Sequence, residues 1–211
     1  MKKNYSHITV ILDRSGSMNS VRNDIVGGFN AFLTEQKTID GDCTVTLVQF
    51  DGQEPYDILR DFVPLAKVQP LGNEYEPRGS TPLYDAIGQG VTRTGNRLSA
   101  LPEDERPDKV LFVILTDGHE NASKEFTKTQ IAEITKHQTE KYNWQFIYLG
   151  ANQDGMAEGM KAGFSQHTSA TYDQMNTAGA FQACAKKMSA YRGSGNLKDL
   201  EWTAADRKSL A

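Results

Sequence analysis

The chain has 211 residues, of which 38% are hydrophobic and 24% are charged, so it can bury the core of one large domain. Its net charge of −4 and the lack of lysine- or arginine-rich runs argue against a nucleic-acid-binding protein. The first apolar run is too short for a secretion signal and no run is long enough to span a membrane, so we expect a soluble, cytoplasmic protein. Cys43 and Cys184 lack the spacing of metal ligands, and we expect two free, buried thiols.

Apolar runs separated by helical patterns indicate alternating strands and helices. Residues 8–12 are β-branched and nearly continuous, which is typical of a strand covered on both faces. In residues 19–33, a polar Asn-Ser pair that can cap a helix precedes apolar positions on one helical face. Residues 44–50 and 56–63 are two further strands. Because the loop between them is too short for a crossover, we expect an antiparallel hairpin.

The second part of the chain continues this alternation after a proline- and glycine-rich loop at residues 65–79. Further strands are expected at residues 110–115, at residues 144–149 and, as a short edge strand, near Phe164. Helices are expected after Pro82, around Ile131 and Ile134, around Met156 and Met160, and from Met175 to Met188.

This order of elements predicts an α/β, doubly wound sheet that is mostly parallel and has one antiparallel edge strand. We expect one domain over residues 1–192. The amphipathic pattern ends there, and residues 193–211 are expected to form a weakly helical or disordered tail.

Two aspartates lie just past the ends of the most apolar strands. Asp13 follows the first strand and Asp117 follows the strand at residues 110–115. In an open parallel sheet, both strand ends face one crevice, where such folds bind ligands. Ser15 and Ser17 alternate with Asp13, so an extended loop would direct all three side chains to one point.

Oxygen donors without nitrogen or sulfur are typical of a site for a hard cation such as Mg²⁺, Mn²⁺ or Ca²⁺. For either segment alone, a helix cap or a tight turn explains the residues equally well. The pairing of both segments with Gly79-Ser80-Thr81-Pro82-Leu83 favours the cation site.

Together, three segments resemble the von Willebrand factor type A (VWA) domain with its metal-ion-dependent adhesion site. These are Asp13-Arg14-Ser15-Gly16-Ser17, Thr81 in its Gly-Ser-Thr-Pro-Leu setting, and Asp117-Gly118 after an apolar strand. They occur in the family's order, and the resemblance covers residues 5 to 191. It implies a Rossmann-like three-layer sandwich. It also implies that Ser15, Ser17 and Thr81 offer hydroxyls to the metal, while Asp13 and Asp117 bind it directly or through water.

The resemblance further implies a non-catalytic, metal-dependent protein-binding module whose metal shell is completed by a partner's Asp or Glu. We expect Mg²⁺ because of its cellular abundance, with Mn²⁺ or Ca²⁺ as other options. The chain looks like the intracellular bacterial or phage branch of the family, in which partners are often AAA+ ATPases or other cytoplasmic assembly factors. We expect neither nucleic acid nor a membrane as partner.

An enzyme is the alternative, namely a Mg²⁺-dependent phosphohydrolase of the haloacid dehalogenase type that uses Asp13. That class needs a second aspartate two residues later as acid–base, and the residue there is Ser15, whose hydroxyl is a poor general acid. No other enzyme motif occurs, so we expect no catalysis. A protein without a metal would require five oxygen-bearing residues to coincide by chance.

Four other residues admit two interpretations each. His119 and Glu120 either shape the rim of the site or form a solvated loop pair. Asp85 either supports the Thr81 loop or lies on a solvated helix surface. Trp202 in the tail either docks on a partner or folds back onto the domain.

Overall fold

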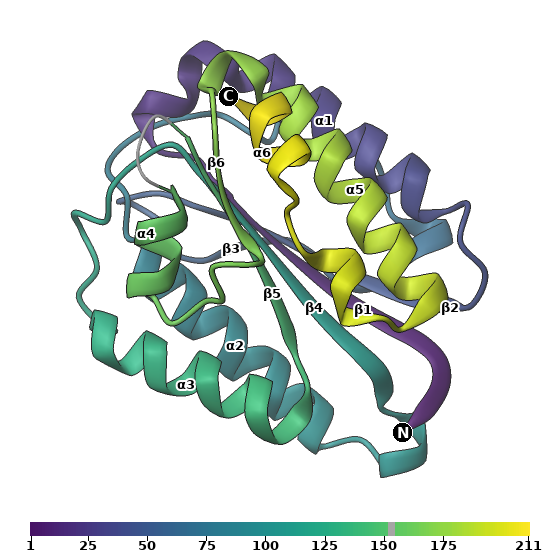
Figure 1. Ribbon diagram of the computed structural model, residues 1–211. Helices are drawn as coiled ribbons and strands as arrows, with labels where there is room; N and C mark the ends of the chain where they lie inside the picture. Colours follow the sequence, from purple (N-terminus) through teal and green to yellow (C-terminus); the bar gives the residue numbers. More distant parts are fainter. Residues whose placement is uncertain (152–154) are drawn as a thin grey trace.

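A six-stranded sheet with helices on both faces forms the framework of the protein (Figure 1). The computed structural model describes residues 1–151 and 155–211. The strands run in the order β3-β2-β1-β4-β5-β6, and every neighbouring pair is parallel except β2 and β3. The predicted α/β fold with one antiparallel edge strand is therefore confirmed. The bounds are β1 (Lys2–Asp13), β2 (Asp42–Phe50), β3 (Asp57–Pro64), β4 (Pro107–Thr116), β5 (Gln145–Ala151) and β6 (Ser169–Tyr172).

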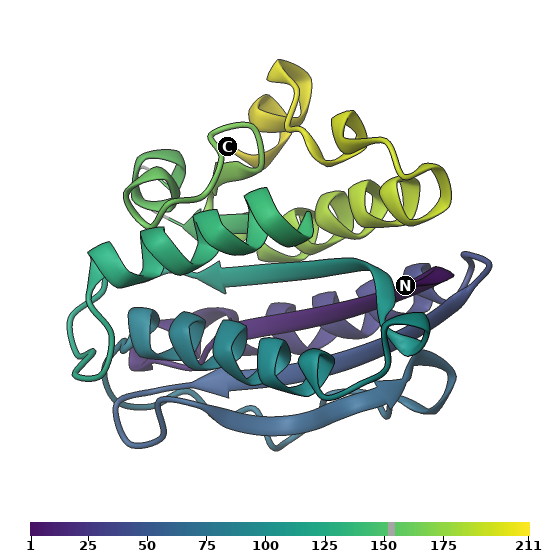
Figure 2. The same cartoon turned by 90° about the horizontal axis from the view of Figure 1, so that it is seen from below.

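The helices lie in two layers. In Figure 2, α2 and α3 lie in front of the sheet, and α1 and α5 lie behind it. The α-helices are α1 (Arg22–Gln36), α2 (Leu83–Ser99), α3 (Lys128–Tyr142), α4 (Gly155–Lys161), α5 (Thr177–Ser194) and α6 (Ala204–Leu210). The 3₁₀ turns are η1 (Gly16–Val21), η2 (Leu65–Lys67), η3 (Glu103–Glu105), η4 (Gln174–Asn176) and η5 (Leu197–Leu200).

Alternate residues of the central strands supply two apolar cores, one on each face of the sheet. In β1, Ile8, Val10 and Leu12 belong to the core under α1 and α5, whereas Ile11 belongs to the core under α2 and α3. All four side chains are fully buried. Because both faces are covered, the central strands are nearly continuous apolar runs, and such runs located them in the sequence.

The outer strand β6 lies at residues 169–172, not near Phe164, where the sequence analysis expected it. Phe164 lies in the loop after α4, and its N–H donates to the carbonyl of Gly159 at 2.9 Å. Its ring stacks on Phe146 and Tyr148. The expectation was wrong because an aromatic residue that packs into the core from a loop leaves the same apolar signal as a short strand.

Two helix starts also differ from expectation. Asn19 and Ser20 do not cap α1, because both lie within η1, and α1 begins with no side-chain cap. Met175 does not belong to the buried face of α5, because it lies in η4 and is 84% exposed. The carboxylate of Asp173 accepts the N–H of Met175 at 2.9 Å and turns the chain there. The helical spacing of Met175 is therefore coincidental.

The last residues, 193–211, are ordered and folded back onto the domain. They form η5 and α6, and α5 itself continues past the expected boundary at residue 192. Trp202 is 5% exposed, and its indole N–H donates to the carbonyl of Thr168 at 3.2 Å, so this residue folds back rather than remaining available for docking. Leu210 is buried as well. Of the two expected states of the tail, the helical one agrees with η5 and α6, whereas the disordered one is wrong because Leu200, Trp202 and Leu210 are buried.

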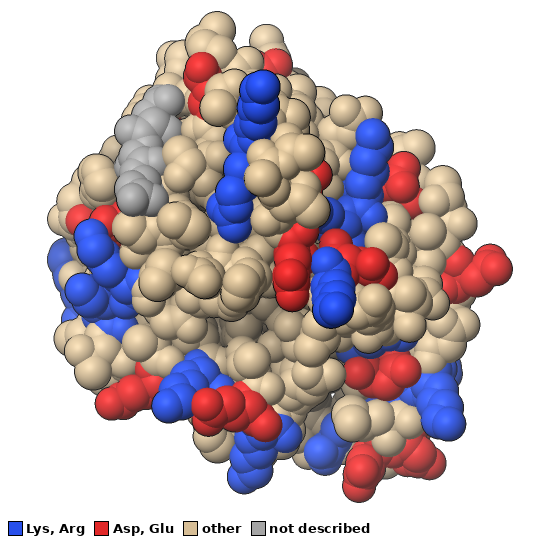
Figure 3. Space-filling view, viewed as in Figure 1, with Lys and Arg blue, Asp and Glu red and all other residues tan. Residues whose placement is uncertain are grey.

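The two free, buried thiols agree with the sequence analysis. Cys43 and Cys184 are free and buried, and burial raises the pKa of the Cys43 thiol to about 11 and that of Cys184 to about 12. Within the described residues, no helix combines the length and the apolar character that crossing a bilayer requires. On the face seen in Figure 3, acidic and basic side chains intermingle without a continuous basic surface.

Replacing Trp202 tests whether the tail packs in solution. We expect Trp202→Ala to lower the free energy of unfolding by about 3 kcal/mol, because a buried indole and its hydrogen bond are lost. Denaturant titration measures the difference. Leu197→Ala, at a residue 47% exposed in the same segment, is the matched control and should cost less than about 1 kcal/mol. Equally small losses for both variants would contradict the packed tail.

Candidate metal centre

The five predicted site residues come from three loops that meet at the carboxyl end of the sheet. β1 ends at Asp13, and Asp117 directly follows β4, its parallel neighbour. Ser15 and Ser17 lie where the chain leaves β1 and enters η1, and Thr81 lies just before α2. The parallel pairing of β1 with β4 therefore brings the two aspartates to the same edge, as the sequence analysis expected.

Asp13 is the buried base of the site. One carboxylate oxygen accepts the N–H of Ser15 at 2.7 Å, and the other accepts the hydroxyl of Thr116 at 2.5 Å. Burial raises the pKa of Asp13 to about 6, although the hydrogen bonds from Thr116 and Ser15 act in the opposite direction. Among the described residues, no lysine or arginine forms an ion pair with this carboxylate. A buried carboxylate without a countercharge is well suited to a cation.

Ser17 links the first loop to the second aspartate. The hydroxyl oxygens of Ser15 and Ser17 lie 3.1 Å apart, and the Ser17 hydroxyl donates to Oδ1 of Asp117 at 2.6 Å. Burial raises the pKa of Asp117 as well. Neighbouring ligand oxygens of an octahedral Mg²⁺ lie about 2.9 Å apart, because each lies about 2.1 Å from the ion. The spacing of these oxygens is therefore close to that of a cation shell.

Thr81, the fifth candidate ligand, comes from the loop before α2. Its N–H donates to the side-chain oxygen of Asn121 at 2.9 Å, and its carbonyl accepts the N–H of Asn121 at 3.2 Å. A Cβ added to Gly118 would lie 3.0 Å from the Thr81 hydroxyl oxygen and 3.7 Å from Oδ2 of Asp13. Both oxygens thus border the backbone of Gly118, and the glycine leaves the space between them open.

The donor set of two carboxylates and three hydroxyls fits a hard divalent cation. Within the described residues, no group of three or more His, Cys, Asp or Glu side chains is placed to hold a metal ion, so the candidate site depends on hydroxyl oxygens in addition to its two carboxylates. The five oxygen-bearing side chains are linked through neighbouring contacts at the carboxyl end of the sheet.

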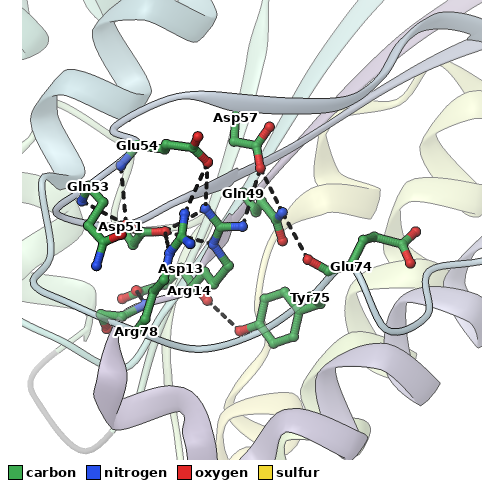
Figure 4. Close-up of polar contacts among 11 residues, drawn as sticks. Asp13, Arg14, Gln49, Asp51, Gln53, Glu54, Asp57, Glu74, Tyr75 and Arg78 are labelled. Carbon is green, nitrogen blue, oxygen red and sulfur yellow. Dashed lines mark hydrogen bonds and ion pairs between the residues drawn. The ribbon is translucent and has the colours of Figure 1, made fainter.

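An ion-pair network next to Asp13 was not anticipated from the sequence (Figure 4). Asp51 is fully buried and accepts from Arg14 Nε at 2.8 Å and from Arg78 Nε at 3.1 Å. Both guanidinium groups also reach Glu54, at 3.2 Å and 3.1 Å. Burial alone would raise the pKa of Asp51, but backbone N–H groups of Gln53 and Glu54, together with both arginines, hold it below its usual value.

These arginines join the loops that carry the site. Arg14 lies between Asp13 and Ser15, and Arg78 lies three residues before Thr81. The backbone follows the same pairing, because the N–H of Arg78 donates to the carbonyl of Arg14 at 2.8 Å. Asp51 thereby fixes the first hydroxyl loop and the threonine loop to the end of β2. The only signal in the sequence for this role of Asp51 was its position directly after an apolar strand.

A second set of contacts fixes the loop after Asp117 to the start of α2. Asp85 is buried, and its carboxylate accepts the N–H groups of three successive residues, 124–126, at 2.8–2.9 Å. Glu120 accepts the N–H of Tyr84 at 3.0 Å, while His119 is exposed. Asp85 is thus no solvated surface group, and Glu120 organises its loop rather than remaining solvated.

Gln174 in η4 is a further residue that the sequence analysis did not anticipate. Its side-chain amide donates to Oδ2 of Asp117 at 2.6 Å and to the carbonyl of Ser17 at 3.3 Å. Nothing in the local sequence indicated this contact, because a lone glutamine in a loop has no distinguishing pattern.

No protein-family model and no curated protein matches the sequence. Solved structures do share its fold. Proximal thread matrix protein 1 from the mussel byssus has a TM-score of 0.58 at 16% identity, over 88% of this chain and 46% of its own. A von Willebrand factor type A structure from Catenulispora acidiphila has a TM-score of 0.56 at 16% identity, over 89% of this chain and 42% of its own. The pilus adhesin SpaC from Lactobacillus rhamnosus GG has a TM-score of 0.61 at 12% identity, over 90% of this chain and 31% of its own.

The mussel and Catenulispora acidiphila neighbours are VWA-type domains, and at these identities the likeness shows a shared fold. A further structure of the mussel protein has a zinc-occupied MIDAS motif, the metal-ion-dependent adhesion site; its TM-score is 0.56 at 16% identity. This chain spans less than half the length of each of these solved chains.

The arginine network gives a direct stability test. We expect Asp51→Asn to lower the free energy of unfolding by about 3 kcal/mol or more, because Arg14, 4% exposed, loses its buried countercharge. Glu54→Gln removes a carboxylate from the same two arginines, but the Glu54 side chain is 56% exposed, and the loss should stay below about 1 kcal/mol. Denaturant titrations compare both with wild type. Losses of equal size would mean that Asp51 is not the anchor.

Proposed function

We propose that this chain is a non-catalytic, divalent-metal-dependent protein-interaction module. Asp13, Ser15, Ser17, Thr81 and Asp117 would hold the cation. The observation that carries the proposal is the convergence of these five oxygen-bearing side chains at the carboxyl end of the sheet, where open parallel sheets bind ligands. The VWA-type fold of the neighbours, one of them with zinc in its motif, supports a divalent cation in general.

Mg²⁺ is the cation we propose, with Mn²⁺ and Ca²⁺ as other hard ions that the oxygen set would accept. Three of the five donors are uncharged hydroxyls, which coordinate without cancelling the charge of the ion. When bound, the ion supplies an electrophilic position for one further oxygen ligand. Asp13 and Asp117 keep it in place, while Ser15, Ser17 and Thr81 orient the shell.

The ligand we propose for that position is an Asp or Glu carboxylate of a partner protein. A carboxylate matches a hard cation in charge and donor type, and the surrounding loops would shield the bond from water. An AAA+ ATPase or another cytoplasmic assembly factor is the kind of partner we propose, which would place the protein in the cytoplasm.

A phosphohydrolase that uses Asp13 is the less favoured function. Such chemistry needs a proton-donating group beside the nucleophile, and the residue two positions later is Ser15. The N–H of Ser15 donates to Asp13, and its hydroxyl lies next to Ser17. Neither group is a suitable acid at neutral pH.

Mg²⁺ titration by calorimetry tests the metal site. We expect one ion per chain, and we expect Ser17→Ala to weaken binding about tenfold or more because one ligand oxygen is lost. Ser20→Ala, at an exposed serine of the same 3₁₀ turn, is the matched control and should bind like wild type. Unchanged affinity in an Asp13→Ala, Asp117→Ala double variant would refute the assignment. Metal-dependent hydrolysis of phosphomonoesters that disappears in Asp13→Asn would instead favour the enzyme.

Partner capture is tested with the immobilised chain and extract of the source cells. We expect proteins retained in Mg²⁺ to be released by EDTA and not to be retained by Thr81→Ala, because that variant loses one hydroxyl ligand. Thr81→Ser keeps the hydroxyl and should retain them. Thr81→Ala should keep its melting temperature within about 4 °C, the shift that about 1 kcal/mol produces in a chain of this size. Retention that is the same in EDTA and in Thr81→Ala would place the partner on another surface.

A further inference from the structure

The turn between β6 and α5 contacts the candidate metal site on one side and the end of the chain on the other. On the site side, Gln174 donates both hydrogens of one amide group, to Oδ2 of Asp117 at 2.6 Å and to the carbonyl of Ser17 at 3.3 Å. Oδ1 of Asp117 accepts from the Ser17 hydroxyl. The carboxylate is therefore held from two directions, and one of them depends on where η4 lies.

On the other side, the last residues of the chain hold the same turn. The N–H of Asp173 donates to the carbonyl of Leu210 at 2.8 Å. The side-chain amide of Asn176 donates to the carbonyl of Ser209 at 2.7 Å. These two hydrogen bonds come from residues on either side of Gln174 in the sequence, so they attach the turn to the end of the chain.

The C-terminal segment, residues 197–211, is in turn docked on β6 and α5, as Figure 1 shows for α6. Arg207 donates to the carbonyl of Ser169 at 2.8 Å, and Asp206 forms an ion pair with Lys187 of α5 at 2.7 Å. Leu210 is 1% exposed. This docking fixes the carbonyls that hold the turn.

Apolar burial does little to hold the turn itself. Met175, at its centre, is 84% exposed, and η4 contains no buried residue. The side chain of Gln174 contacts Asp117 and Ser17, whereas its neighbours Asp173 and Asn176 contact the C-terminal segment. The hydroxyl of Thr177 also donates to the carbonyl of Gln174 at 2.7 Å. Segments with few buried apolar contacts open locally at low cost, so we expect this turn to move when either set of contacts is removed.

We propose that the C-terminal segment sets the cation affinity of the candidate site through Gln174, a positioning residue for Asp117. The inference rests on the proposed function, because it concerns the same cation. Hydrogen bonds from non-ligand groups fix the orientation of a liganding carboxylate, and their loss typically weakens metal binding tenfold or more. With the segment docked, Gln174 holds Asp117 facing Ser17; with the segment displaced, Asp117 loses that restraint.

Calorimetric titration of the full-length protein with Mg²⁺ alone tests this. We expect Gln174→Ala and Leu210→Ser each to weaken binding about tenfold, the first directly and the second by loosening the end of the chain. The decisive variant combines both. If the segment acts through Gln174, the double variant binds no more weakly than Gln174→Ala alone.

Two matched controls should bind like wild type. Gln182→Ala changes an exposed glutamine of α5, and Ser209→Ala keeps the carbonyl that holds Asn176. The melting temperature of every variant is measured alongside, so that affinity is compared among folded proteins. If Leu210→Ser does not fold, Asn176→Ala replaces it, because that change removes a contact with the segment and leaves the buried leucine in place.

The outcomes separate the inference from the proposed function. Wild type that binds one Mg²⁺, together with unchanged affinity in Gln174→Ala or in the segment variant, overturns the inference alone. Additive weakening in the double variant also overturns it, because the segment would then act by another route. Wild type that binds no Mg²⁺ overturns the proposed function and the inference with it.

Discussion

One buried carboxylate, Asp51, holds together the loops on which the candidate metal site is built. It accepts hydrogen bonds from Arg14 and Arg78 and has no exposed surface. A buried charge is tolerated only when its partners are in place, so the two loops that carry these arginines are constrained to one arrangement. That arrangement holds the loop of Ser15 and the loop of Thr81 together at the end of β1.

The loop of the second aspartate is restrained in the same manner, by polar side chains that are not themselves candidate ligands. Asp85 and Glu120 attach the chain after Asp117 to the start of α2, and Gln174 holds the carboxylate from η4. The fold itself therefore sets the distances between the candidate ligand atoms. A shell that is arranged before the ion arrives loses less conformational freedom on binding.

The two edges of the sheet are protected by different means. In β3, Phe62 adopts a left-handed backbone conformation (φ 49°) beside irregular pairing with β2, and its ring stacks on His7 at 3.7 Å. Irregular pairing makes such an edge a poor template for another strand. At β6, the C-terminal segment covers the edge, and the same segment holds the turn that contains Gln174. Protection of this edge and positioning of Asp117 thus share one structural element.

The sequence alone predicted the α/β fold with its antiparallel edge strand, and it predicted that Asp13 and Asp117 lie at one edge of the sheet. Strands buried on both faces require continuous apolar runs, and Asp13, Ser15 and Ser17 follow such a run at short, regular spacing. Only the tertiary structure decided which side chains hold these loops and where residues 193–211 lie. Arg14 and Asp51 are 37 residues apart, and Asp117 and Gln174 are 57 apart. Polar contacts over such distances leave no periodic pattern in either segment, because they depend on how the elements pack and not on local repeat.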